Sequence, residues 1–166
     1  MRITDLMTTP PVTVTPRATA RDAAREMSEQ QVGCVLVAEH ETLHGILTDR
    51  DLVVRALAQG TAPDAPVSEL MSAPAVTVDT TDDLDAAYRA FRRTGVRRLP
   101  VLDGHRLVGV LTIDDLFRDV LQHLADLLGP VSISALRESG PGPGAAEHPA
   151  PRRITPWTAA GTPSAT

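Results

Sequence analysis

Two pairs of side chains in this 166-residue sequence have a spacing suited to binding an anion. Thr48 precedes Asp51 by three residues, and Thr112 precedes Asp115 in the same way. If a helix begins just after each threonine, its free backbone N–H groups and partial positive charge suit a phosphate. The aspartate, one turn into the helix, can accept hydrogen bonds from two adjacent hydroxyls, and the threonine hydroxyl can donate or accept beside it. The same T-x-x-D spacing is that of a capping box, which stabilises a helix end without any ligand.

A glycine stands shortly before each of these threonines, inside an apolar run. Gly45 precedes Thr48, and Gly109 precedes Thr112. Because a glycine inside a strand weakens that strand, it often marks the close approach of a ligand or of another backbone segment. The pattern therefore leaves two interpretations open, a ligand-binding site and a helix cap that needs no ligand.

The sequence repeats itself at an offset of 64 residues, without a gap. LMTTPPVTV at 6–14 matches LMSAPAVTV at 70–78, and LHGILTDRDL at 43–52 matches LVGVLTIDDL at 107–116. A repeat of this length is typical of a duplicated supersecondary unit. The two T-x-x-D pairs therefore occupy equivalent places in two copies of one unit.

Each unit begins with a short strand, predicted at 12–14 and at 76–78, and continues with an amphipathic helix. The apolar residues of these helices follow the spacing i, i+3, i+4, i+7, which places them on one helix face. They are Ala20, Ala23, Ala24 and Met27 in the first helix, and Leu84, Ala87, Tyr88 and Phe91 in the second. A T-x-x-D pair precedes each helix, and we predict that both pairs act as N-terminal caps. These pairs are Thr19 with Asp22 and Thr80 with Asp83.

Two apolar runs, which we expect to form a hairpin, follow in each unit, and a second helix closes it. The hairpin strands are predicted at 34–38 with 43–48 and at 99–102 with 107–112. The second helices begin after Thr48 and Thr112. Each unit is therefore β-α-β-β-α, and the fold class is α/β (α+β). One such unit is too small to bury both of its faces, so we expect the two to pack together pseudo-symmetrically.

The domain organisation follows from the repeat and from a change in composition near the end of the chain. We assign the first repeat to 1–60, a linker to 61–66 and the second repeat to 67–128. A short extension follows at 129–137. The stretch 138–166 is rich in proline and glycine, and this composition predicts a disordered tail.

The ordered set of motifs resembles the cystathionine-β-synthase (CBS) domain. The set runs from LM…P…VTV through a helix to GVRRLPVLD at 95–103 and LVGVLTIDDL at 107–116. Two such domains in tandem resemble the pair called a Bateman module, in the free-standing form found in bacteria. The resemblance implies a module that binds adenine nucleotides, and sometimes S-adenosylmethionine, in clefts between the repeats. It also implies that the ligand state is passed to a partner, and that two pairs assemble into a flat dimer.

The resemblance further implies which residues contact the ligand. They are Thr13, Thr48, Asp51, Thr77, Arg97, Arg98, Thr112 and Asp115. The Thr–Asp pairs would contact the ribose and phosphate, and the threonines of the first strands would lie beside the adenine. A guanidinium would hold phosphate oxygens, which its planar fork of donors suits.

The two repeats differ at the basic positions. Repeat 2 has Arg97 and Arg98 where repeat 1 has Gly33 and Cys34. Arg50 could compensate in repeat 1. We therefore expect two clefts that are not equivalent, one of which could stay empty.

Two functions remain open from the sequence. The first is a regulatory module that senses an adenosyl ligand (AMP, ADP, ATP or S-adenosylmethionine) and signals to a protein partner that the sequence does not identify. The alternative is a structural or interaction protein of the same fold, in which the T-x-x-D pairs are only caps. We expect no enzyme activity, because the chain has no nucleophile elbow, P-loop or dinucleotide fingerprint. We also expect no required cofactor and no metal site, because His40, His44 and Cys34 fit no metal-binding template.

Net charge and cysteine content indicate which partners and which cell compartment we expect. A net charge of −5 and a pI near 5.5 indicate neither nucleic acid nor membrane as a partner. A single cysteine, with no apolar run long enough for a signal peptide or membrane helix, favours a cytoplasmic protein. Many apolar residues in the second helices predict a homodimer, and they include Leu116, Phe117, Val120 and Leu124.

Overall fold

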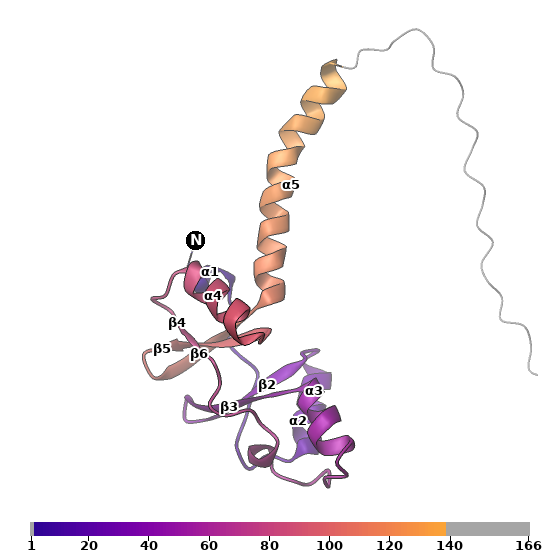
Figure 1. Cartoon of the computed structure of the whole chain (residues 1–166), viewed down its shortest axis with the longest axis vertical. Helices are drawn as coiled ribbons and strands as arrows, with labels where there is room; N and C mark the ends of the chain where they lie inside the picture. Colours follow the sequence, from indigo (N-terminus) through magenta and orange to yellow (C-terminus); the bar gives the residue numbers. More distant parts are fainter. Residues whose placement is uncertain (1, 139–166) are drawn as a thin grey trace, which may run out of the picture. The chain divides into compact units, whose positions relative to one another are not determined.

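The computed structural model describes the backbone of residues 2–138 and the side chains of residues 2–129 (Figure 1). It contains two three-stranded sheets and the helices that flank them, which confirms the predicted mixed α/β class. Most of the predicted tail, 139–166, lies outside the described residues. One compact unit extends to Asp126 and holds both repeats.

The two sheets have the same topology. In repeat 1, β1 (Thr13–Val14) pairs in parallel with β2 (Cys34–Glu39), which pairs antiparallel with β3 (Thr42–Thr48). In repeat 2, β4, β5 and β6 repeat this arrangement. Their bounds are Val78–Asp79, Arg98–Asp103 and Arg106–Thr112. Both hairpins have a register shift at the same place, between Val37 and Ala38 and between Val101 and Leu102. The duplication read from the sequence is therefore a duplication of structure.

The first helix of repeat 1, α2 (Ala20–Glu29), begins as predicted. Thr19 and Asp22 form a capping box, in which the Asp22 backbone N–H donates to Thr19 Oγ1 over 3.1 Å. Ala20, Ala23 and Met27 are buried, but Ala24 is exposed, since the i+4 position lies at the edge of this narrow buried face.

The predicted cap of the equivalent helix in repeat 2, α4 (Leu84–Thr94), is wrong. Asp83 itself is the N-cap and accepts a hydrogen bond from the backbone N–H of Ala86 over 2.8 Å. Asp83 lies 64 residues after Thr19, the cap of α2. The repeat offset therefore predicts the correct cap, whereas the T-x-x-D spacing from Thr80 predicts the wrong one. Tyr88, predicted on the buried face, has an exposed fraction of 40%.

The last helices of the two repeats differ. In repeat 1, α3 (Asp49–Asp51) is a single turn that continues as the wider π-helical turn η1 (Leu52–Leu57). In repeat 2, α5 runs over Ile113–Glu138 and includes the stretch assigned to a short extension. None of the described helices is both long and apolar enough to cross a membrane.

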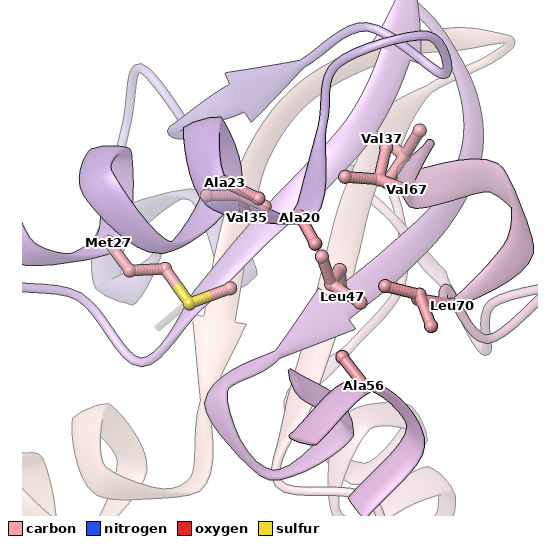
Figure 2. Close-up of a cluster of buried hydrophobic side chains, with 9 residues drawn as sticks. All are labelled: Ala20, Ala23, Met27, Val35, Val37, Leu47, Ala56, Val67 and Leu70. Carbon is pink, nitrogen blue, oxygen red and sulfur yellow. The ribbon is translucent and has the colours of Figure 1, made fainter. Parts of the chain in front are cut away.

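The leading segment of each repeat packs into the core of the other repeat. The turn η2 (Val67–Glu69) begins repeat 2. Its first residue, Val67, and the next residue after the turn, Leu70, lie in the buried cluster of repeat 1 (Figure 2). In the opposite direction, Ile3 of α1 (Ile3–Leu6) lies in the cluster of repeat 2. Because each core needs residues from both halves of the chain, the repeats interlock.

Gly45 and Gly109, which lie in strands, let the leading segment of one repeat pack closely against the other repeat. A Cβ atom at Gly45 would lie 2.7 Å from the Ser72 carbonyl oxygen, and one at Gly109 would lie 3.0 Å from that of Thr8. These contacts accompany backbone bridges between Ile46 and Ser72 and between Thr8 and Val110. Backbone approach therefore explains both glycines without a ligand.

Candidate functional site

Both T-x-x-D pairs form capping boxes. In repeat 2, the Thr112 hydroxyl donates to Asp115 Oδ2 over 2.7 Å, and the Asp115 N–H donates to Thr112 Oγ1 over 3.1 Å. Thr48 and Asp51 have the same two distances. The cap uses Oδ2 of each aspartate, so Oδ1 remains for another partner. A capping box and a binding site are therefore compatible at the same residues.

A cavity of about 310 Å³ lies between the repeats beside the second capping box. Repeat 1 and its leading segment contribute Thr8, Val12, Gln31, Val32, Gly33, Cys34 and Leu36. Repeat 2 contributes Arg98, Val110, Thr112, Asp114, Asp115 and Arg118. The volume is at the lower end of the range of small-molecule sites, about 300–1,000 Å³. Aliphatic walls and charged groups at one end give the cavity the mixed lining of such sites.

Arg98 reaches across from β5 to the start of β2. A Cβ atom at Gly33 would lie only 2.5 Å from Arg98 Nη2, so the absence of a side chain at Gly33 makes room for this guanidinium. Within the described part of the chain, Arg98 forms no ion pair and no side-chain hydrogen bond. Its donors are therefore available to a ligand in the cavity.

Three of the predicted site residues meet at this cavity, namely Arg98, Thr112 and Asp115. Thr13 and Thr77 line two other hollows, of about 450 and 350 Å³. Successive side chains of a strand point to opposite faces, so Val12 lines the cavity while Thr13 does not.

The remaining predicted arginines lie at the surface. Arg97 is exposed and pairs with Asp114 over 3.5 Å. Arg50 is also exposed. Neither residue lines the 310 Å³ cavity.

Sequence reasoning missed Arg118. This residue lines the cavity, and its Nη1 lies 3.3 Å from Asp115 Oδ1. The signal was present, because residues three apart on a helix share a face. Repeat 1 has Val54 at the equivalent position, so this basic residue is specific to repeat 2.

Cys34 is buried and lines the same cavity. Burial raises the pKa of its thiol. The positive charge of Arg98 lowers this pKa, and the negative charge of Asp49 raises it further. Each unit of increase in the pKa lowers the thiolate fraction about tenfold at a pH below it. Because the thiolate is the reactive form, the native thiol is a poor nucleophile at neutral pH.

This environment predicts slow alkylation of Cys34. We expect iodoacetamide to react at pH 7.5 more slowly with the folded chain than with the chain in urea, because burial raises the pKa of the thiol and lowers its thiolate fraction. The rate should increase through a pH range above that of an ordinary cysteine. Mass spectrometry of timed samples measures both rates. Equal rates in the two states would contradict the buried, raised-pKa environment.

The fold and the cavity together define a class of protein, a tandem α/β repeat pair with a ligand-sized cavity between its repeats. The CBS domain family matches residues 3–57 and 67–122, and the chain belongs to this family. The CBS domain-containing protein YhcV of Bacillus subtilis is 40% identical over 114 residues, which cover 69% of this chain and 81% of that protein.

Two solved structures show the same fold. A CBS domain protein of Pyrobaculum aerophilum, complexed with AMP, has a TM-score of 0.67 at 32% identity and is covered over 99% of its length, against 76% of this chain. Hypoxic Response Protein I, with two coordinated zinc ions, has a TM-score of 0.66 at 33% identity and is covered over 98%, against 71% of this chain. In this chain, the described residues include no group of three or more His, Cys, Asp or Glu side chains that could hold a metal ion.

Proposed function

We propose that this chain is a regulatory module that binds an adenosyl ligand of the AMP, ADP or ATP class between its two CBS repeats. The observation that carries the proposal is the convergence of Arg98, Thr112 and Asp115 on a 310 Å³ cavity. The similar protein of Pyrobaculum aerophilum was solved in complex with AMP, which supports this ligand class. S-adenosylmethionine is a further candidate.

The lining suggests how the ligand would lie. Its phosphate would meet Arg98 and the first N–H groups of α5, because a helix N-terminus and a guanidinium both attract phosphate oxygens. Its ribose hydroxyls would donate to Asp115 Oδ1, which the cap does not use and which the exposed Arg118 contacts over 3.3 Å. Val12 and Val110 would cover the adenine faces, since the chain has few aromatic residues.

In this proposal the module has no catalytic role. It acts in the cytoplasm, and a change in its ligand state alters its contact with a partner protein. The alternative, a structural or interaction protein without a ligand, makes a different prediction for the experiment below.

Ligand-dependent stability tests the proposal. A ligand at a hundred times its Kd raises the free energy of unfolding by about 2.7 kcal/mol. We expect AMP, ADP or ATP to raise the melting temperature in a thermal-shift panel that also includes S-adenosylmethionine and guanosine monophosphate. Equal melting temperatures across the panel, at millimolar ligand, would favour the structural alternative.

We also propose that the chain forms a homodimer through its second helices. Several apolar side chains of α5 are exposed within the single chain. They are Phe117 at 64%, Val120 at 43%, Leu121 at 50% and Leu124 at 48%. A contiguous apolar face of this kind favours association, and two-fold assemblies are the commonest oligomers.

Dimer formation predicts a mass of twice 17.7 kDa in sedimentation equilibrium at micromolar concentration. A charge placed on the apolar face should break the dimer, so Leu121→Glu should sediment as a monomer with an unchanged far-UV spectrum. Glu29→Ala, at the exposed end of α2, serves as the control and should leave the mass unchanged. A monomeric wild-type protein would contradict this assembly.

A further inference from the structure

The repeat offset identifies the counterpart of the cavity in repeat 1. The cavity is lined by Thr8 and Asp115, and the residues 64 positions away from them are Ser72 and Asp51. A second ligand would therefore need Ser72 and Asp51 to be accessible. Both are already held by one side chain of the protein.

That side chain is Arg55, on η1. Its Nη2 donates to Ser72 Oγ over 3.1 Å and lies 3.4 Å from Asp51 Oδ1, the oxygen that the capping box leaves over. Its Nη1 donates to the carbonyl oxygens of Leu70 over 2.8 Å and Met71 over 3.1 Å. The guanidinium thus joins the carboxylate of α3 to the segment that leads into repeat 2.

We propose that Arg55 is an internal plug that closes the repeat 1 cleft, so that each chain takes a single adenosyl ligand, in the cavity of Arg98 and Asp115. The inference rests on the proposed function, because it assigns that ligand to one of two related clefts. It follows from the hydrogen bonds, since a ribose that displaced the guanidinium from Asp51 Oδ1 would also have to break its bonds to Ser72 and to two backbone carbonyls.

Repeat 2 has no guanidinium at the position equivalent to Arg55. The counterpart of Arg55 is Asp119, an acidic residue whose described ion-pair partner is His123 on the same helix, at 3.4 Å. Arg118 Nη1 does donate to Asp115 Oδ1, over 3.3 Å, but within the described residues it makes no other hydrogen bond, and its side chain has an exposed fraction of 78%, compared with 40% for Arg55. The guanidinium beside Asp115 is therefore the more exposed of the two and can turn toward a phosphate.

The residue that faces the phosphate reinforces this difference. In the cavity Arg98 provides a guanidinium that has no ion-pair partner among the described residues, and its counterpart in repeat 1 is Cys34, which is neutral and buried. Removal of Arg55 would leave Cys34, without a charge, at the position that Arg98 occupies in the cavity. We therefore expect an opened cleft to bind AMP more weakly than the cavity does.

Two reciprocal variants of the full chain test the plug, with AMP as the probe and calorimetric titration as the measurement. The wild-type protein should bind one AMP per chain. Arg55→Met keeps the aliphatic stem but removes the guanidinium, and it should add a second, weaker site. Asp119→Arg transplants the plug to repeat 2, four residues after Asp115 and in a hollow that also contains Leu6, the counterpart of Leu70, and it should lower the affinity of the original site at least tenfold. Asp119→Asn removes the acidic charge without adding a guanidinium, and it should still bind one AMP.

The outcomes separate the plug from the proposed function. Two AMP molecules per wild-type chain would overturn the plug and leave the proposed function standing. If AMP, ADP and ATP all fail to bind the wild-type chain, the proposed function is overturned together with the plug that rests on it. A folded Arg55→Met with a single site would overturn the plug. If Arg55→Met does not fold, Asp119→Arg tests the plug instead. Unchanged AMP affinity in a folded Asp119→Arg variant would overturn the inference.

Discussion

Replacing Asp115 with alanine is expected to weaken AMP binding about ten- to a hundred-fold while the protein remains folded. The carboxylate contributes one oxygen to the cap and offers the other to the ligand. Losing a hydrogen bond to a charged group costs about 1.5–3 kcal/mol, which corresponds to roughly this loss of affinity. Calorimetric titration with AMP measures the effect directly.

The same substitution also removes a helix cap, so its stability cost needs a matched control. Asp22 occupies the equivalent position in the capping box of α2, where the Thr19 hydroxyl donates to Asp22 Oδ2 over the same 2.7 Å. Asp22 does not line the cavity. We expect Asp22→Ala and Asp115→Ala to lower the free energy of unfolding alike, by about 0.5–2 kcal/mol.

Only Asp115→Ala should change AMP affinity. If both variants lose similar stability and neither loses affinity, the Thr112–Asp115 pair is only a capping box. The proposed function would then lose its main support at the level of residues.

The repeat made most of the fold predictable. Strands and amphipathic helices have local signatures, and the offset of 64 residues requires both units to agree. The hairpins accordingly lie within one residue of their predicted places. The cap at Thr80 was wrong because the T-x-x-D spacing also occurs in turns, whereas the offset from Thr19 leads to Asp83.

The candidate site was less predictable, because it depends on contacts between distant segments. The Thr–Asp capping boxes are local and could be predicted from four residues. The placement of Arg98 over Gly33, and of Arg55 on the Leu70 and Met71 carbonyls, depends on how the two repeats interlock. No local spacing encodes that packing.

The interlocking of the repeats also predicts a large effect at the start of the chain. The first residues of a domain usually tolerate change, because they are rarely tied down. Ile3 differs, since its exposed fraction is 0% and it lies in one buried cluster with Phe91, Leu99 and Leu111 of repeat 2. We expect Ile3→Ala to lower the free energy of unfolding by about 2–5 kcal/mol, the cost of removing a large buried aliphatic side chain.

Urea unfolding at a fixed chain concentration measures this loss. The control is Leu57→Ala, which shortens an aliphatic side chain whose exposed fraction is 79% and should change the free energy of unfolding by about 0.5 kcal/mol or less. Because Ile3 belongs to the leading segment of repeat 1 and its neighbours belong to repeat 2, a large loss at Ile3 would measure how strongly the exchange couples the repeats. A loss no greater than that of Leu57→Ala would mean that the leading segment of repeat 1 contributes little to the core of repeat 2.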